Sequence, residues 1–403
     1  MATGFSPIFC FSTAKEVLMD CTTFLPSAVR RCCQRLHQAG FEGYPVGGCV
    51  RDLLLGRTPQ DWDVCTSALP HQVQALFPHT VPTGLAYGTI TVVEDGFPVE
   101  VTTYRQETAY HDGRRPDAVA FVSSLEQDLS RRDFTINAMA LTLDGHILDP
   151  FGGQADLQAR RVRCVGEPKQ RFTEDRLRLF RAIRFGAQLD FHLEEQLLHA
   201  LLELGAQPHT LPPERIRPEV EKTLCASAPR WTGLLFSSGL LSTFLPKRLD
   251  LDTSVLSALP STPLARWAGL VTLLRQEGAD PLPLLRGLIP DRTLIGPLTQ
   301  ALPLEFPLDA RGWRHLLSRH GEATCQALAA MSLRPQPLQA LEDVLAQAPC
   351  ISPKQLALSG KDLMALGLSG PNIGRAQKML LEHVLNHPED NTAPVLRRLL
   401  SQT

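Results

Sequence analysis

The sequence lacks an apolar run of the roughly 18 residues that a membrane-spanning helix needs. Its ten cysteines show no Cys-x-x-Cys spacing, and the adjacent Cys32-Cys33 pair is a poor disulfide candidate. This usage favours a reduced, cytoplasmic protein. Residues 1–20 lack an early basic cluster and a sustained apolar stretch, so we expect no signal peptide and interpret residues 1–24 as a variable leader.

The chain also lacks a charge excess of either sign. Its formal net charge is −2, so any surface for a polyanion must be local. A length of 403 residues is too great for one compact core and predicts two to four parts.

Two adjacent glycines, Gly47 and Gly48, precede a short amphipathic segment, Val50–Leu55. A helix that starts after such glycines presents free backbone N–H groups, which can take a phosphate. Arg51 adds a fixed charge with several hydrogen-bond donors. A lone Gly-Gly is, however, usually an ordinary turn.

Asp61 and Asp63 follow on a second, β-like segment. Because side chains alternate along a strand, both carboxylates leave the same face and can hold hard cations between them. A lone Asp-x-Asp is more often a solvated strand end. A phosphate cradle beside a carboxylate pair, in contrast, is what nucleotidyl transfer requires.

The whole string from Tyr44 to Thr66 resembles the signature of the class II tRNA nucleotidyltransferases and bacterial poly(A) polymerases, a branch of the DNA polymerase beta superfamily. The resemblance implies an α+β fold, in which a polymerase-beta-like head with a mixed sheet and helices precedes an all-α neck, body and tail. The expected parts are a head at 25–166, a neck at 167–226, a body at 227–348 and a tail at 349–403. Asp61 and Asp63 would hold two Mg²⁺ ions.

Within the head, Leu25–His37 has helical apolar spacing, and Pro70–Phe77 predicts a short helix. Gly88–Val93 and Phe97–Tyr104 are rich in Thr, Val and Ile and are joined through Asp-Gly, which predicts a β-hairpin. Glu100 on the second strand lies near the third carboxylate of related polymerases. It is equally typical of a solvated strand residue, and we do not count it as a metal ligand.

The polar segment Arg105–Pro116 predicts a loop. Its His111-Asp112 pair is similar to a metal phosphohydrolase signature, but no companion histidines support that interpretation. The family resemblance implies that this loop helps the enzyme proceed from adding C to adding A.

Leu129–Leu141 predicts a helix with a polar start. An Arg-Arg-Asp group is by itself more often a surface ion-pair cluster. In the resembled family the matching segment contacts the ribose and phosphates of the incoming nucleotide, which implies these roles for Arg132, Asp133 and Asn137.

Between residues 160 and 184, nine basic residues stand against three acids. This local excess would attract a polyanion. Glu174–Arg184 predicts a helix on which Asp175, Arg178, Arg181 and Arg184 recur every third position. A solvated basic helix has the same spacing.

An Asp beside an Arg could bind the amino donor and ring-nitrogen acceptor that C and A share and that U and G lack. The family resemblance gives this base-selecting role to Asp175 and Arg178, and further nucleotide contacts to Arg181 and Arg184. The Glu-Arg-Ile string at 214–216 is similar to the family's last neck motif, which supports the selecting helix.

The C-terminal segment carries glycines at expected helix starts beside Lys361, Arg375 and Lys378, which could contact an RNA backbone. Short helices capped by glycine are also common packing units. In the resembled family this tail grips tRNA.

Together these motifs imply template-independent addition and repair of the 3′-terminal CCA of tRNA from CTP and ATP, with Mg²⁺ as cofactor and release of pyrophosphate. The family makes a homodimer plausible. Three alternatives stay open: an enzyme that adds only A, a poly(A) polymerase, and a non-catalytic tRNA-binding protein.

Overall fold

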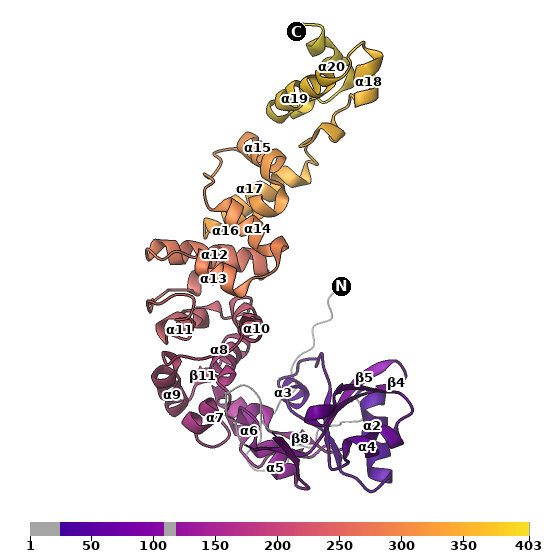
Figure 1. Ribbon diagram of the computed structural model, residues 1–403, viewed down its shortest axis with the longest axis vertical. Coiled ribbons are helices and arrows are strands. Elements are labelled where there is room, and N and C mark those ends of the chain that lie inside the picture. The colour runs from indigo at the N-terminus through magenta and orange to yellow at the C-terminus, as the bar shows by residue number, and fades with distance from the viewer. Residues whose placement is uncertain (1–24, 109–117, 403) are drawn as a thin grey trace. The chain divides into compact units, whose positions relative to one another are not determined.

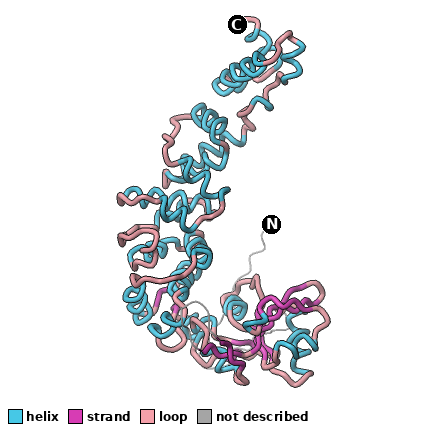
Figure 2. Tube along the Cα trace, in the orientation of Figure 1, coloured by secondary structure: helices cyan, strands magenta, loops and turns pink. Residues whose placement is uncertain are grey.

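The computed structural model describes residues 25–108 and 118–402. The expected leader at 1–24 and the His111-Asp112 pair therefore lie outside the described residues. The chain divides into two compact units. Unit 1 runs to Arg215 and includes Ser238–Leu240, and unit 2 comprises Ile216–Ser237 and the chain from Leu241 onward. The described strands all lie in unit 1, whereas unit 2 is built of helices and loops (Figure 2).

Unit 1 contains a mixed five-stranded sheet with the order β1-β2-β5-β4-β3. The strands are β1 (Gly43–Pro45), β2 (Asp63–Thr66), β3 (Thr80–Gly84), β4 (Thr89–Glu94) and β5 (Phe97–Thr103). Only β2 and β5 pair in parallel; the other neighbours are antiparallel. The sheet confirms the expected α+β head.

The β4–β5 hairpin forms as the sequence predicts. Its turn residues Asp95 and Gly96 have φ angles of 52° and 78°, the left-handed conformation that tight hairpin turns require. Two helices, α2 (Ser27–Gln38) and α4 (Pro70–Leu76), contact each other and pack on β4 and β5 (Figure 1). They therefore cover one face of the sheet.

The helix expected over Leu129–Leu141 is wrong. Helix α5 (Leu125–Ser130) covers only the first two residues of this range. A 3-10 turn, η2 (Thr135–Asn137), then leads into β8 (Ala140–Leu141), which pairs with β9 (Ile147–Leu148). A fully buried apolar run looks alike in a helix and in a strand, so spacing could not distinguish them. The backbone of this segment instead joins the glycine turn, because Gly47 N donates to Met139 O at 3.1 Å.

The expected continuous helix over Glu174–Arg184 is interrupted. Helix α7 (Pro168–Glu174) ends at Asp175, which has an extended backbone (φ −140°, ψ 108°), and α8 (Leu177–Leu189) begins two residues later. The Asp175 carboxylate accepts a hydrogen bond from Leu177 N at 3.0 Å. A short acidic side chain that bonds the backbone two residues on competes with a continuous helix, which explains the break.

Unit 1 also contains a 3-10 turn, η1 (Leu85–Tyr87), and several further elements. They are β6 (Arg105–Thr108), β7 (Ala118–Phe121), α6 (Gly153–Gln158), β10 (Arg161–Val162), β11 (His192–Leu193) and α9 (Glu195–Gly205). The division between the two units falls within α10 (Pro213–Leu224).

Unit 2 is helical, as the Leu- and Ala-rich sequence predicts. Its α-helices are α11 (Thr232–Ser237), α12 (Pro263–Gln276), α13 (Leu282–Leu288), α14 (Arg292–Ala301), α15 (Ala310–His320), α16 (Glu322–Met331), α17 (Pro335–Ala346), α18 (Gly360–Ala365), α19 (Pro371–Asn386) and α20 (Ala393–Leu400). Its 3-10 turns are η3 (Pro229–Trp231), η4 (Ser254–Ala258), η5 (Pro353–Gln355) and η6 (Pro388–Asp390). The last three α-helices share a separate apolar cluster around Leu363, Leu380 and Leu396. No helix of the described chain has the length and apolar character that crossing a bilayer demands.

Candidate active site

The glycine turn lies between β1 and α3 (Gly48–Leu54). Gly47 caps this helix with a φ of +83°, a conformation that side-chain-bearing residues rarely adopt. A Cβ atom at Gly47 would lie 2.9 Å from Nη1 of Arg132. The glycine is therefore required both by the backbone and by the arginine packed against it.

The two aspartates lie at the beginning of β2, the second strand in the sheet order, but only Asp63 belongs to the strand, so the expectation that both alternate along it is wrong for Asp61. Asp63 is the first residue of β2, and Asp61 precedes the strand in an exposed bend. Burial, opposed by Arg132 and reinforced by the carboxylates of Glu100 and Asp61, raises the pKa of the Asp63 carboxyl to about 6. Glu100 lies directly opposite Asp63 in the parallel pairing of β2 and β5. The site thus concentrates negative charge that a cation would neutralise.

This donor set fits a hard divalent ion. Within residues 25–108 and 118–402, no three His, Cys, Asp or Glu side chains gather as a metal-binding group. A pair of carboxylates is nevertheless the protein share that Mg²⁺ commonly takes, because substrate phosphates and water supply its other ligands. Asp61 and Asp63 therefore stay the predicted metal ligands.

A buried acid, Asp133, anchors the arginines on the other side of the site. Its carboxylate accepts hydrogen bonds from Arg181 Nε at 2.7 Å, Asn137 Nδ2 at 3.2 Å and Phe134 N at 2.8 Å. Asn137 in turn accepts one from Arg51 Nη1 at 2.7 Å. Residues from three distant segments therefore form one continuous hydrogen-bonded network.

A second buried acid, Asp128, holds two arginines that follow it in the chain. Arg131 Nη2 lies 2.8 Å and Arg132 Nη2 3.3 Å from its carboxylate. Burial alone would raise the pKa of Asp128, but the two guanidinium groups outweigh it and lower that pKa. Asp128 thus keeps its charge and fixes Arg132 beside Asp63 and Gly47.

The two residues predicted to select the base, Asp175 and Arg178, are each paired with another residue. The Asp175 carboxylate lies 3.0 Å from Arg215 Nη2, and Arg178 Nη1 lies 2.7 Å from the Glu174 carboxylate. The helix break at Asp175 accounts for this arrangement, because it turns Asp175 away from the regular i, i+3 position.

The predicted nucleotide and metal residues of the head and neck all line one cavity of about 640 Å³ within unit 1. These residues are Gly47, Gly48, Arg51, Asp61, Asp63, Arg132, Asp133, Asn137, Asp175, Arg178, Arg181 and Arg184. Of the described lining residues, eight are arginines and five are aspartates. The resulting positive excess suits a triphosphate.

Sequence reasoning missed several residues of the cavity wall. Arg105, Arg131 and Phe185 line it without having been assigned a role, and Arg215, which also lines it, was expected only to support the selecting helix. Asp128 holds Arg131 and Arg132 in the cavity wall. It precedes them by three and four residues, a spacing that indicates ion pairs on one helical turn and was visible in the sequence.

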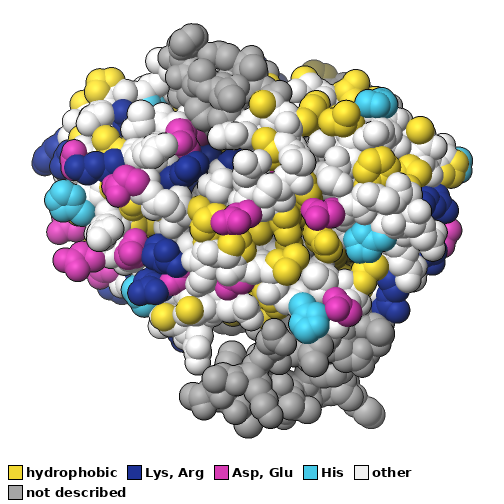
Figure 3. Space-filling view, turned by 90° about the horizontal axis from the view of Figure 1, so that it is seen from below, with side chains coloured by type: hydrophobic (Ala, Val, Ile, Leu, Met, Phe, Trp, Pro, Cys, Tyr) yellow, Lys and Arg dark blue, Asp and Glu magenta, His cyan; other side chains and the backbone are white. Residues whose placement is uncertain are grey.

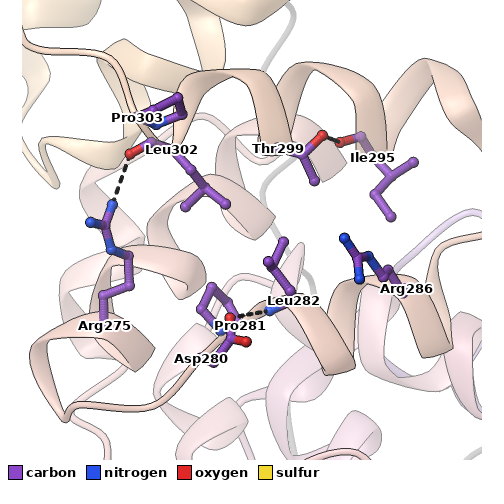
Figure 4. Close-up of a pocket in the computed structure, with 9 residues that line it drawn as sticks. All are labelled: Arg275, Asp280, Pro281, Leu282, Arg286, Ile295, Thr299, Leu302 and Pro303. Carbon is purple, nitrogen blue, oxygen red and sulfur yellow. Dashed lines mark hydrogen bonds between the residues drawn. The ribbon is translucent and has the colours of Figure 1, made fainter.

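A cavity of about 720 Å³ in unit 2 has a different character (Figure 4). Arg275 at its edge donates to Leu302 O at 3.0 Å. Among its described lining residues Asp280 alone carries a carboxylate, and that group accepts from Leu282 N at 3.0 Å. This cavity therefore offers no paired carboxylates for metal chemistry.

The predicted tail residues Lys361, Arg375 and Lys378 are exposed on α18 and α19 of unit 2. The structure places them outside the cavity, and their role in RNA binding stays a prediction. On the face shown in Figure 3, basic side chains are interspersed with acidic ones, in keeping with the net charge of −2. Any attraction for RNA must come from local groups.

Comparisons with known proteins agree with this fold. The family model of the poly(A) polymerase head domain matches residues 43–163, and that of the probable RNA- and SrmB-binding site of polymerase A matches residues 190–250. The CCA-adding enzyme of Geobacillus sp. (strain WCH70) is 38% identical over 374 residues, covering 88% of this chain and 91% of that protein.

Solved structures with a similar fold are also those of CCA-adding enzymes. The crystal structure of the Bacillus stearothermophilus CCA-adding enzyme in complex with CTP matches with a TM-score of 0.73 and 31% identity, covering 94% of this chain and 99% of that one. The Thermotoga maritima CCA-adding enzyme complexed with tRNA matches with a TM-score of 0.64 at 21% identity, covering 96% and 98%, and shows likeness of fold alone.

A head domain of this fold with a glycine turn and paired aspartates defines a nucleotidyltransferase of the poly(A) polymerase head class. Within this class, a sequence identity of 38% over 88% of this chain identifies a particular family. The chain belongs to the family of CCA-adding enzymes.

Proposed function

We propose that this protein adds and repairs the 3′-terminal CCA of tRNA, using CTP and then ATP without a nucleic-acid template. The observation that carries the proposal is the single cavity in which two aspartates, a glycine turn and eight arginines converge. We further propose that residues 25–166 act as the head, 167–226 as the neck, 227–348 as the body and 349–403 as the tail that binds tRNA.

The glycine turn and its arginines bind the triphosphate. Gly47 and Gly48 let the phosphates approach the backbone, while Arg51 and Arg132 donate charge-assisted hydrogen bonds to them. Arg132 is held in place by Asp128 at 3.3 Å. These contacts orient the α-phosphate for in-line attack by the tRNA 3′-hydroxyl.

Asp61 and Asp63 form the metal site. Mg²⁺ bound there would lower the pKa of the attacking 3′-hydroxyl and neutralise charge on the triphosphate and the departing pyrophosphate. Burial raises the pKa of Asp63 to about 6, and a cation held there would favour the charged carboxylate.

Asp175 and Arg178 select the base. An acceptor and a donor at fixed positions pair with the Watson–Crick edge that C and A share, and a U or G would leave both groups unpaired. Arg215 at 3.0 Å and Glu174 at 2.7 Å hold the two side chains in position. Arg181, Arg184, Asp133 and Asn137 complete the nucleotide site.

The experiment supplies Mg²⁺ and the protein with tRNAs that end before C, after CC or after CCA. Labelled CTP or ATP is added, and the new 3′ ends are sequenced. Completion of CCA and no extension beyond it supports the proposal. Addition of A alone to CC ends indicates an A-adding enzyme, unlimited A addition a poly(A) polymerase, and no addition by a folded sample a binding protein.

We also propose that the protein works in the cytoplasm and as a homodimer. The eight described cysteines are free, and seven of them are buried, which suits a reducing compartment. Light scattering of the purified protein tests the dimer, since a mass close to the 44.4 kDa of one chain would contradict it.

A further inference from the structure

One aromatic side chain in the cavity contacts three of its arginines. Phe185 on α8 is 4% exposed and nevertheless lines the cavity. The guanidinium carbon of Arg184 lies 4.0 Å from the centre of its ring, that of Arg51 5.2 Å and that of Arg181 5.6 Å. All three distances fall within the range of cation–π attraction.

Each arginine is also held by an oxygen acceptor away from the ring. Arg184 Nη1 donates to Gln188 Oε1 at 2.8 Å, and Arg181 Nε donates to Asp133 at 2.7 Å. Arg51 donates to Asn137 at 2.7 Å. These acceptors differ from one arginine to the next, whereas the ring of Phe185 is a contact that all three guanidinium groups share.

The ring itself is fixed by its neighbours. Phe134 meets it edge to face, with ring centres 5.5 Å apart and an interplanar angle of 79°. Phe134 is fully buried. A buried ring backed by a second ring cannot swing away, so it offers a stable negative surface to three cations.

We propose that Phe185 is a positioning residue that keeps Arg51, Arg181 and Arg184 directed at the triphosphate of the incoming nucleotide. The inference rests on the proposed function. Mutual repulsion between three like charges would otherwise spread the side chains in the empty site. The ring offsets part of this repulsion before substrate arrives, so less ordering is needed when a nucleotide binds.

The test compares three variants of the full-length protein. Phe185→Leu removes the ring and keeps an apolar side chain, whereas Phe185→Tyr keeps the ring. Phe180→Leu is the matched control, because Phe180 is a fully buried phenylalanine on the same helix whose ring meets His209. KM and kcat are measured for CTP on tRNA lacking CCA and for ATP on tRNA ending in CC. Inhibition by inorganic tripolyphosphate is measured alongside.

We expect F185L to raise KM for both nucleotides, and the inhibition constant of tripolyphosphate, by roughly tenfold, the equivalent of losing one to two cation–π contacts. F185Y should stay within about threefold of the unsubstituted protein, and F180L should lower the melting temperature without moving KM.

Three results would overturn the inference: an unchanged KM in F185L, an equal rise in F180L, or a folded F185Y as impaired as F185L. Measurements on the unsubstituted protein distinguish a failure of this inference from a failure of the proposed function. If it fails to extend tRNA, the proposed function is wrong, and tripolyphosphate binding measured by calorimetry still tests the role of Phe185.

Discussion

The buried Asp133 carboxylate makes the sharpest prediction about stability. It is 7% exposed and paired with Arg181 at 2.5 Å. Burial alone would raise the pKa of this carboxyl, but Arg181 and the other donors outweigh burial and lower it from 3.8 to about 2. Each pKa unit corresponds to about 1.4 kcal/mol, so the charged form stabilises the fold by about 2 kcal/mol at neutral pH.

Asp133→Asn should therefore lower the free energy of unfolding of unit 1 by about 2 kcal/mol at pH 7. Because the folded pKa lies below the unfolded one, the contribution is fully present above about pH 5 and is lost as the pH falls toward 2. By pH 3 the difference between the two proteins should shrink to roughly half.

The free energy of unfolding of unit 1 can be measured by urea unfolding followed by fluorine NMR of protein labelled with 5-fluorotryptophan. Trp62 reports on unit 1, because the other three tryptophans, Trp231, Trp267 and Trp313, lie in unit 2. Asp190→Asn is the control, because Asp190 is partly exposed and pairs with Arg160 at 3.5 Å. A loss below about 0.5 kcal/mol in D133N, the usual scatter of surface substitutions, would refute the reasoning. So would a loss equally large at pH 3.

Three further outcomes are expected. Gly47→Ala should raise KM for ATP at least about tenfold, because it strains a φ of +83° and displaces Arg132. Gly278→Ala is the control, since Gly278 has a φ of +72° and open space around it. An equal rise in KM in this control would contradict the prediction. Excess EDTA should abolish nucleotide incorporation and Mg²⁺ should restore it, and activity that persists in EDTA would exclude the metal site. Replacing the exposed Lys361, Arg375 and Lys378 with alanine should weaken tRNA binding and reduce its salt dependence by about two to three counterions, with KM for CTP unchanged; an unaltered salt slope would remove these residues from the RNA surface.

Local sequence patterns were enough to predict much of the head. The alternating apolar residues of β4 and β5 and their Asp-Gly turn determine a hairpin without help from the rest of the chain. The amphipathic spacing of α2 does the same. The fold class itself was expected from the family resemblance, and the structure and the comparisons confirm it.

Interactions between distant residues could not be predicted in the same way. Asp175 leaves the helix because its carboxylate bonds Leu177 N and Arg215, and Arg215 lies 40 positions further along the chain. The buried run after Asp133 forms a 3-10 turn and a strand because its backbone joins the glycine turn. In both places a tertiary contact overrides the local preference for helix.

Some of the basic residues between positions 160 and 184 stabilise the fold, a role that composition could not reveal. Arg161 and Arg163 both pair with Asp156, which is fully buried, at 2.5 and 2.8 Å. These arginines stabilise the fold, whereas Arg178, Arg181 and Arg184 line the cavity. Charge counts locate a basic region, but only the fold separates structural arginines from those that meet a ligand.

The central claim is that Asp61 and Asp63 hold the metal ions for nucleotide addition. The most direct test measures the single-turnover rate of ATP addition to tRNA ending in CC. The samples are the Asp63→Asn variant, the Glu100→Gln variant and the unsubstituted protein. Loss of one of the two predicted metal ligands should slow addition by roughly a thousandfold, equivalent to several kcal/mol of transition-state stabilisation, while the protein still binds tRNA. Glu100→Gln, outside the proposed ligand pair, should retain most of the rate. Addition by a folded Asp63→Asn at the rate of the unsubstituted protein would contradict the account.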